Sequence, residues 1–359
     1  MRSAGLRSAG LRSAGLRSAL KSRLLWPILT LVALLLLNVI VEPGFFAIRI
    51  QDGHLFGSLI DILRNGAPTV LVAIGMTLVI ATRGIDLSVG AVVAISGAVA
   101  VSIIGDSPNP GDLGTVLVAC AIAVGFALVL GAWNGFLVAV FGIQPIIATL
   151  ILLTAGRGIA QLVTEGQILT ITSPPYKVIG GGYWLTLPAS IVIVAFLFVL
   201  AAVLTRKTAL GMLIESVGIN PEASRLAGVG SRNITWTVYI FSGLCAGIAG
   251  LMISSNVTAA DANSAGLWIE LDAILAVVLG GTSLAGGRYS LVGSLIGAFV
   301  IQTLTTTVYS IGVAPEITLV FKALVVITVC LLQSPVLLDR FRARRRRNPA
   351  PTTKQEVAA

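Results

Sequence analysis

Long apolar runs of close to 20 residues recur along the whole chain, and short polar segments join them. A helix needs about 20 mainly apolar residues to cross the hydrocarbon core of a bilayer. Inside that core the backbone must satisfy its own polar groups, and a helix does so within one segment. We therefore predict an all-α, polytopic integral membrane protein with about ten transmembrane helices. The expected spans are residues 24–42, 60–82, 88–104, 113–140, 146–164, 187–205, 235–255, 270–287, 290–310 and 316–334.

The charges of this chain are few and unevenly placed. Charged residues make up 11% of the chain, whereas a soluble domain carries about a quarter. The net charge of +9 is concentrated at the two ends and in the polar loop 206–234. Because cations gather on the cytoplasmic side of membrane proteins, we expect this loop and both termini to be cytoplasmic. Nucleic-acid binding is not expected, because no polar domain is present to hold a nucleic acid.

Three parts of the chain differ in composition. Residues 1–23 contain an RSAGL repeat and six cations, which predict a disordered basic cytoplasmic arm; an over-extended start codon explains the repeat equally well. Residues 24–336 form the transmembrane domain, and residues 337–359 form a basic cytoplasmic tail. The three cysteines lie in separate apolar runs and there is one histidine, so neither disulfides nor a metal site are expected. No nucleophile and base are seen at matching depth, so an enzyme is not expected.

Polar residues and glycines interrupt the apolar pattern in the stretch TRGIDLSVGAVVAISG, residues 82–97. Asp86 and Ser88 are residue types that cap a following helix, which predicts a tight capped turn at the cytoplasmic face. Together with Gly84 they also fit a hinge or gate, because irregular backbone at membrane depth lines a cavity or is covered by protein. Both interpretations remain open at this point.

A second glycine-rich turn, which contains Gly280 and Gly281, lies between two apolar segments in residues 276–297. Its similarity to the stretch around Asp86 suggests a weak internal repeat, as transporters often have. No GK[ST] motif follows these glycines, so they do not form a nucleotide-binding loop. We interpret the turn as a further part of a solute path or gate.

Several polar side chains fall within predicted spans or directly before one: Asn134, Gln144, Thr149 and Arg157. Amides and hydroxyls can join neighbouring helices or bind the hydroxyl groups of a sugar. Arg157 either lines a path, as ionisable residues inside membranes usually do, or extends outward to water. We interpret Lys322 as a residue that extends outward in this way.

The energy source of a transporter can be judged from its buried carboxylates. Ion-coupled carriers generally place carboxylates within their spans, whereas the acids here lie at predicted span ends. This pattern disfavours an ion-coupled secondary carrier without excluding it. In the loop 206–234, Asn220 and Pro221 predict the start of a short helix and Gly228 its end. This helix has a small apolar face, which is either a surface for an external motor or part of an ordinary interfacial helix.

Four motifs carry a resemblance to a known family, over roughly residues 50 to 335. They are GMTLVIATRGIDLSVGAVVAISGA (75–98), PIIATLILLTAGRGIAQLVTEGQ (145–167), ALGMLIESVGINPEASRLAGV (209–229) and ELDAILAVVLGGTSLAGGR (270–288). With these motifs the chain resembles the inner-membrane permeases of bacterial ABC sugar importers, which include ribose, xylose, arabinose and galactofuranose permeases. Within this family, the residues QDGHLFGSLIDIL, WNG and ADANSAGLW are most similar to the galactofuranose branch.

The resemblance implies a complex in the bacterial inner membrane. Such permeases pair with a second permease chain, bind a cytoplasmic ABC ATPase at the loop 206–234, and receive a monosaccharide from an extracytoplasmic sugar-binding protein. ATP and Mg²⁺ belong to the ATPase, so no cofactor is expected on this chain. Galactofuranose is the expected sugar, and a pentose such as ribose or xylose is the alternative. The residues implied to couple with the ATPase are Glu215, Gly218, Asn220, Glu222, Ala223 and Gly228.

Overall fold

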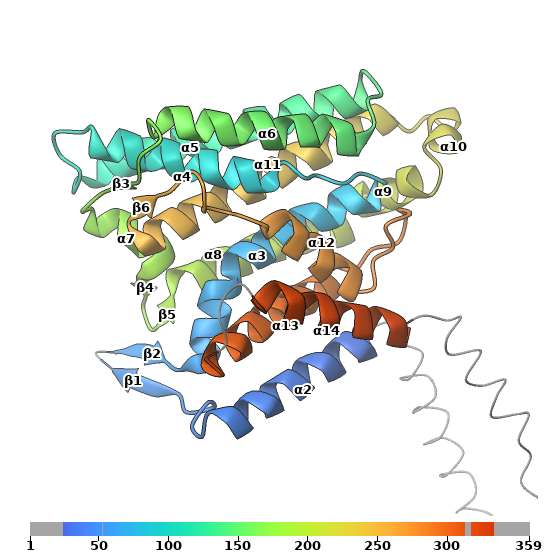
Figure 1. Cartoon of the computed structure of the whole chain (residues 1–359). Helices are drawn as coiled ribbons and strands as arrows, with labels where there is room; N and C mark the ends of the chain where they lie inside the picture. Colours follow the sequence, from blue (N-terminus) through green and yellow to red (C-terminus); the bar gives the residue numbers. More distant parts are fainter. Residues whose placement is uncertain (1–23, 52, 313–316, 334–359) are drawn as a thin grey trace, which may run out of the picture.

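The computed structural model describes residues 24–51, 53–312 and 317–333 of the chain, which form a bundle of helices with a few very short strands (Figure 1). Within these residues, six helices are long and apolar enough to cross a membrane. The expected basic arm 1–23 and the basic tail 337–359 lie outside the described residues. The six long helices are α3 (Ser58–Ala81), α5 (Leu113–Ala139), α6 (Pro145–Val163), α8 (Ala189–Lys207), α11 (Ser231–Val257) and α13 (Leu291–Ser310).

Shorter helices complete the bundle. Four of them are apolar over most of their length: α2 (Leu25–Val41), α4 (Val89–Gly105), α9 (Leu210–Ile219) and α14 (Thr318–Gln333). The others are α7 (Pro174–Gly181), α10 (Pro221–Leu226) and α12 (Ile269–Leu279). Most expected spans agree with a helix to within a few residues, whereas the span 270–287 is wrong. The helix α12 ends at Leu279, because Gly280 and Gly281 turn the chain there.

Helices α3 and α11 form the centre of the bundle, and most residues along their apolar windows are buried. Small residues allow α11 to approach its neighbours closely. A Cβ on Gly131 of α5 would lie 2.6 Å from the carbonyl oxygen of Tyr239, and one on Gly250 would lie 2.3 Å from that of Val93. Close backbone contact of this kind is what associates helices in a bilayer, where lipid is as apolar as the side chains.

The two ends of the bundle differ. One end, at the left of Figure 1, carries α7 and three antiparallel two-stranded ladders. The other end, at the right, carries α9 and α10. The ladders pair β1 (Arg49–Gln51) with β2 (His54–Phe56), β3 (Leu169–Thr170) with β6 (Ala259–Ala260), and β4 (Tyr183–Trp184) with β5 (Leu187–Pro188).

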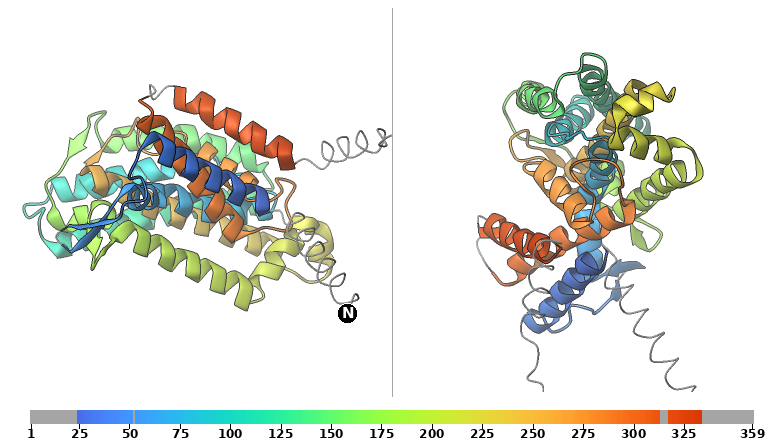
Figure 2. Two further views of the ribbon diagram at one scale, coloured as in Figure 1. Left: turned by 90° about the horizontal axis from the view of Figure 1, so that it is seen from below. Right: turned by 90° about the vertical axis from the view of Figure 1, so that its right-hand side faces the viewer.

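Helices α2 and α14 lie side by side at one edge of the bundle (Figure 2). With α13 they enclose a small apolar core of their own, to which Leu34, Leu304 and Val326 contribute. This edge contacts the rest of the molecule through α12 and α13.

Two irregular, non-helical segments precede the short helices α4 and α12 (Figure 1). We call residues 82–88 the first re-entrant segment and residues 261–268 the second. The starts of the two helices meet, because a Cβ on Gly90 would lie 2.8 Å from the carbonyl oxygen of Gly266 and even closer to Glu270. Irregular backbone at membrane depth needs protein around it, so these segments are the natural place to look for a site.

Candidate functional site

A buried carboxylate, Asp86, is the centre of the first re-entrant segment and is 1% exposed. Its Oδ1 accepts hydrogen bonds from the backbone nitrogen of Ser88 at 3.1 Å and from the Ser88 hydroxyl at 2.6 Å. Its Oδ2 accepts a hydrogen bond from the Ser242 hydroxyl of α11 at 2.9 Å. A carboxylate with three donors can remain buried at an acceptable cost.

Of the two expected caps of α4, Asp86 accepts a hydrogen bond from the backbone nitrogen of Ser88 directly before the helix, whereas the expectation for Ser88 is wrong. Ser88 occupies the N-cap position, but its side chain accepts no hydrogen bond from the helix. Its backbone has helical angles (φ −78°, ψ −12°), whereas a capping side chain usually needs extended backbone at this position. The two side chains instead bond to each other and to neighbouring helices.

Two other predicted residues reach the same segment from α5 and α6. Asn134 donates from Nδ2 to the Ser88 hydroxyl at 2.7 Å, and Thr149 donates from Oγ1 to the carbonyl oxygen of Ile85 at 3.2 Å. Gly84 is required because a Cβ there would lie 2.6 Å from the Tyr239 hydroxyl. The structure therefore gathers Gly84, Asp86, Ser88, Asn134 and Thr149 around one segment.

This polar cluster contains atoms without partners among the described residues. Asn134 Oδ1 and the Tyr239 hydroxyl are both buried and make no hydrogen bond there. Buried polar groups are nearly always paired, so these two atoms mark a place where a different arrangement, or a bound group, would satisfy them. Neither Tyr239 nor Ser242 was singled out from the sequence, because hydroxyls in an apolar helix are common.

Arg157 of α6 holds the second re-entrant segment. Its Nη1 donates to the carbonyl oxygens of Ala262 at 3.1 Å and Ala265 at 2.6 Å. At the start of this segment, Asp261 accepts hydrogen bonds from the Ser264 hydroxyl and from the backbone nitrogen of Asn263. Arg157 therefore satisfies backbone oxygens that lie outside any helix.

Glu270 is a site residue that the sequence analysis did not single out. The structure places it in the first turn of α12, where it is 5% exposed. Its Oε2 has no hydrogen-bond partner among the described residues, and the same holds for Nη2 of Arg157. The signal that could have found it is a carboxylate at the first turn of an apolar helix in the motif at 270–288.

The remaining predicted path residues lie elsewhere. Gly280 ends α12, where a Cβ would lie 2.3 Å from the carbonyl carbon of Gly293, and Gly281 has a positive φ of +84°. Gln144 is exposed at the N-cap position of α6. The interpretation of Lys322 as a side chain that extends outward is wrong: its Nζ lies 2.7 Å from Asp272 Oδ2, with side chains 12% and 19% exposed.

The predicted coupling residues lie on α9 and α10, which we call the coupling segment. Asn220 caps α10 as predicted, because its Oδ1 accepts from the backbone nitrogens of Glu222 at 3.1 Å and Ala223 at 3.0 Å. Pro221 is the first helical residue, and Gly228 follows the helix with a positive φ of +85°. The predicted short helix is thereby confirmed.

The coupling segment has an inner and an outer face. Gly218 is buried and Glu215 is half-buried, whereas Asn220, Glu222 and Ala223 are exposed. Large apolar side chains are also exposed here, since Met212 is 70%, Ile219 60% and Leu226 81% accessible. Exposed apolar side chains at the polar end of a bundle are a feature of surfaces that bind another protein.

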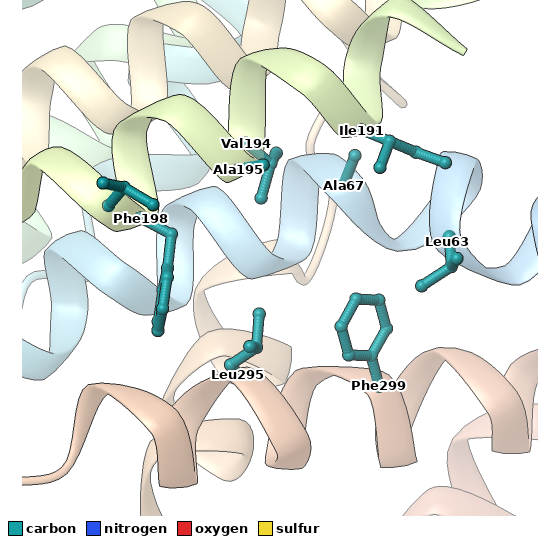
Figure 3. Close-up of a pocket in the computed structure, with 9 residues that line it drawn as sticks. Leu63, Ala67, Ile191, Val194, Ala195, Phe198, Leu295 and Phe299 are labelled. Atoms are coloured by element: carbon teal, nitrogen blue, oxygen red, sulfur yellow. The ribbon is translucent and has the colours of Figure 1, made fainter. Parts of the chain in front are cut away.

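Between α3, α8 and α13 there is a cavity of about 200 Å³ (Figure 3). Its lining is apolar throughout and offers no donor or acceptor to a sugar, so the polar cluster around Asp86 is the better candidate site. No group of three metal-ligating side chains occurs within the described residues. The cavity is lined by Leu63, Ala67, Ile191, Val194, Ala195, Phe198, Val199, Leu295 and Phe299.

Comparison with known proteins identifies the family. A family model described as "Branched-chain amino acid transport system / permease component" matches residues 58–330. The galactofuranose transporter permease protein YtfT of Escherichia coli is 49% identical, over 91% of this chain and 96% of the relative. The fructose import permease protein FruF of Bifidobacterium longum is 40% identical, over 95% of this chain and 96% of the relative.

The ribose import permease protein RbsC of Escherichia coli is 38% identical, over 85% of this chain and 92% of the relative. No solved structure matches the chain. The expected resemblance to ABC sugar permeases is thus confirmed by relatives that cover nearly the whole chain. The chain belongs to this permease family, and within it to the ABC sugar permeases related to the galactofuranose and ribose transporters.

Proposed function

We propose that this chain is the membrane-spanning subunit of an ATP-driven importer that moves a monosaccharide, galactofuranose, into the bacterial cytoplasm. The choice of sugar is supported by the relative with 49% identity, which is a galactofuranose permease. Relatives named for fructose and ribose import are 40% and 38% identical. A pentose such as ribose is therefore the alternative substrate.

The proposed topology has ten passes through the inner membrane, with both termini in the cytoplasm. Six passes are the long helices, and α2 and α14 supply two more. The helix α4 has 17 residues, as α2 does, and supplies a ninth pass. The helix α12 has 11 residues and is too short to span a bilayer of about 30 Å alone. It completes a tenth pass together with the re-entrant segment before it, which gives the even count that two cytoplasmic termini require.

The exposed face of the coupling segment is the observation that carries this proposal. Met212, Ile219 and Leu226 present apolar surface beside the capped helix α10, where a soluble cytoplasmic ATPase would dock. That ATPase would hold ATP and Mg²⁺, and this chain would bind no cofactor. An extracytoplasmic sugar-binding protein would dock at the opposite end, and a second permease chain would complete the sugar path by alternating access.

One observation favours a different energy source. Glu270 is a buried carboxylate whose Oε2 has no partner among the described residues, and ion-coupled carriers use such groups to bind a proton or Na⁺. An ion-coupled carrier is therefore the second candidate. The two candidates differ in what drives uptake.

Reconstitution separates them. Proteoliposomes would hold this chain, a second permease chain and the ATPase, with the binding protein outside. One set would contain ATP, and the other would have an ion gradient across the membrane and no ATP. We expect uptake of labelled galactofuranose that requires internal ATP and the binding protein, and that exceeds uptake of ribose and fructose. Uptake driven by the ion gradient alone would refute the proposal, and preference for ribose would refute the choice of sugar.

Variants test the docking surface directly. Leu226→Asp places a charge on the exposed face, and we expect it to abolish co-purification of the ATPase. Leu185→Asp is the matched control, because Leu185 is 93% exposed at the opposite end of the bundle. Glu222→Ala should weaken association without affecting insertion, since its ion pair with Arg225 is a solvated surface contact. Unchanged co-purification in both Leu226→Asp and Glu222→Ala would contradict the docking assignment.

A further inference from the structure

The inner face of the coupling segment touches two other turns at a single point. A Cβ on Gly218 would lie 1.8 Å from the carbonyl oxygen of Ala81 and 2.5 Å from the backbone nitrogen of Gly287. That nitrogen itself donates a hydrogen bond to the Ala81 oxygen at 2.9 Å. The last turn of α3, the last turn of α9 and the turn between α12 and α13 therefore meet backbone to backbone, and we call this contact the junction.

Arg83 ties the same parts together with its side chain. Its Nε donates to the carbonyl oxygen of Gly218 at 2.6 Å, and its Nη2 donates to that of Ile219. These are the last carbonyls of α9, which have no partner within the helix. Arg83 also has a positive φ of 66°, which is uncommon for a residue with a side chain. The surrounding contacts hold it in this conformation.

The junction joins the elements that a transport cycle would have to move together. Asp86 and α4 follow Arg83 after only a few residues, and α12 ends a few residues before Gly287. On its other side the coupling segment presents the exposed face of α10. The coupling segment is thus exposed on its outer face, and its inner face contacts the end of α3, Arg83 and the turn after α12. Through these it is connected to α4 and α12, which we call the two discontinuous helices because a re-entrant segment precedes each.

At the junction, backbone atoms contact backbone atoms directly. No side chain lies between them that could change its rotamer and so absorb a displacement. Packed interiors have low compressibility and transmit strain, and small shifts at one surface become movements of whole elements when the contact is rigid. A displacement of α9 would therefore be passed on to the first re-entrant segment and to the turn after α12 at the same time.

We infer that the junction of Gly218, Ala81 and Gly287, clasped by Arg83, transmits movement of the coupling segment to both discontinuous helices. Gly218 and Arg83 are positioning residues in this scheme: they act inward, on the gate around Asp86 and Gly280, and not on the ATPase. This inference rests on the proposed function, since it needs a partner that moves the coupling segment.

The test uses the whole complex in proteoliposomes and measures bound ATPase, basal ATP hydrolysis and the sugar taken up per ATP hydrolysed. Gly218→Ala should lower uptake per ATP about tenfold, because its Cβ would meet the carbonyl oxygen of Ala81. Gly230→Ala is the matched control from the same loop, because its Cβ would have no neighbour closer than 3.7 Å. It should match wild type in all three measurements.

Arg83→Gln provides a second variant. It leaves the backbone contact of Gly218 with Ala81 and Gly287 in place, and the new side chain fits because Arg83 is exposed. We expect an intermediate loss of uptake per ATP, partly restored in Arg83→Lys, which retains one donor. Wild-type uptake per ATP in both Gly218→Ala and Arg83→Gln would overturn the inference, and so would loss of bound ATPase in Arg83→Gln. Uptake without ATP in the wild-type complex would instead overturn the proposed function, so the two failures are distinct.

Discussion

The ion pair between Lys322 of α14 and Asp272 of α12 offers a quantitative test of how the edge of the bundle is held. The Nζ and Oδ2 atoms are 2.7 Å apart, and the side chains are only 12% and 19% exposed. Removal of one partner leaves the other charge unpaired in a poorly solvated place, which costs about 3–5 kcal/mol. Asp272→Asn and Lys322→Met should each lower the free energy of unfolding by this amount.

The double variant shows whether the ion pair is the cause of these losses in the free energy of unfolding. With both charges gone no unpaired charge remains, so we expect a loss close to that of one single variant, and well below the sum of the two. The assay is equilibrium unfolding in mixed micelles with increasing SDS, followed by helical circular dichroism. Arg225→Gln is the control, because its pair with Glu222 is 63% and 71% exposed and such pairs contribute about 0–1 kcal/mol.

Two results would refute this reasoning. Additive single losses would mean that the two charges act on different neighbours. Single losses below about 1 kcal/mol would mean that water reaches the pair and screens it as at a surface. In either case the attachment of α14 would depend on the apolar core to which Leu34, Leu304 and Val326 contribute.

Three further perturbations follow from individual contacts. Asn220→Ala removes the cap of α10 and should destabilise this helix by about 1 kcal/mol, seen as faster amide hydrogen exchange after residue 220. Gly280→Ala should lower thermal stability, because its Cβ would meet the backbone of the next helix, whereas Gly158→Ala, with open space at the same distance, should not. Asp86→Asn replaces an acceptor of three hydrogen bonds by an amide and should cost about 1–3 kcal/mol, measured by the same SDS titration. If any of the three variants matches wild type in its measurement, the contact from which that prediction was made does not contribute to stability as described.

The parts of this fold that the sequence predicts are those set by local chemistry. Long apolar runs predicted the helices because each run satisfies its own backbone. The start of α10 was predicted from Asn220 and Pro221, whose preferences act within one turn. In each case the residues that form the structure are neighbours in the chain.

The parts that the sequence did not predict depend on contacts between distant segments. The glycine-rich turn at Gly280 and Gly281 is visible in the sequence, but the close packing of Gly280 against Gly293, which accompanies the end of α12 at Leu279, is not. The sequence shows Asp86 only as a candidate helix cap. The hydrogen bond that it accepts from Ser242, more than a hundred residues away in the chain, appears only in the structure. Hydropathy does not show whether a residue at the end of an apolar run is buried by other helices, so the burial of Glu270 could not be predicted.

The two re-entrant segments give the predicted polar residues a common physical explanation. A segment that forms no helix has carbonyl and amide groups that need other partners, and each such group would cost several kcal/mol if it were left unpaired in hydrocarbon. Thr149 donates to the carbonyl of Ile85, and Arg157 donates to those of Ala262 and Ala265. Polar side chains inside apolar spans of this chain thus satisfy the backbone where α4 and α12 are interrupted. These side chains make the two irregular segments possible and also hold each of them in one arrangement. A gate formed by these segments could therefore open only by exchanging these hydrogen bonds for others.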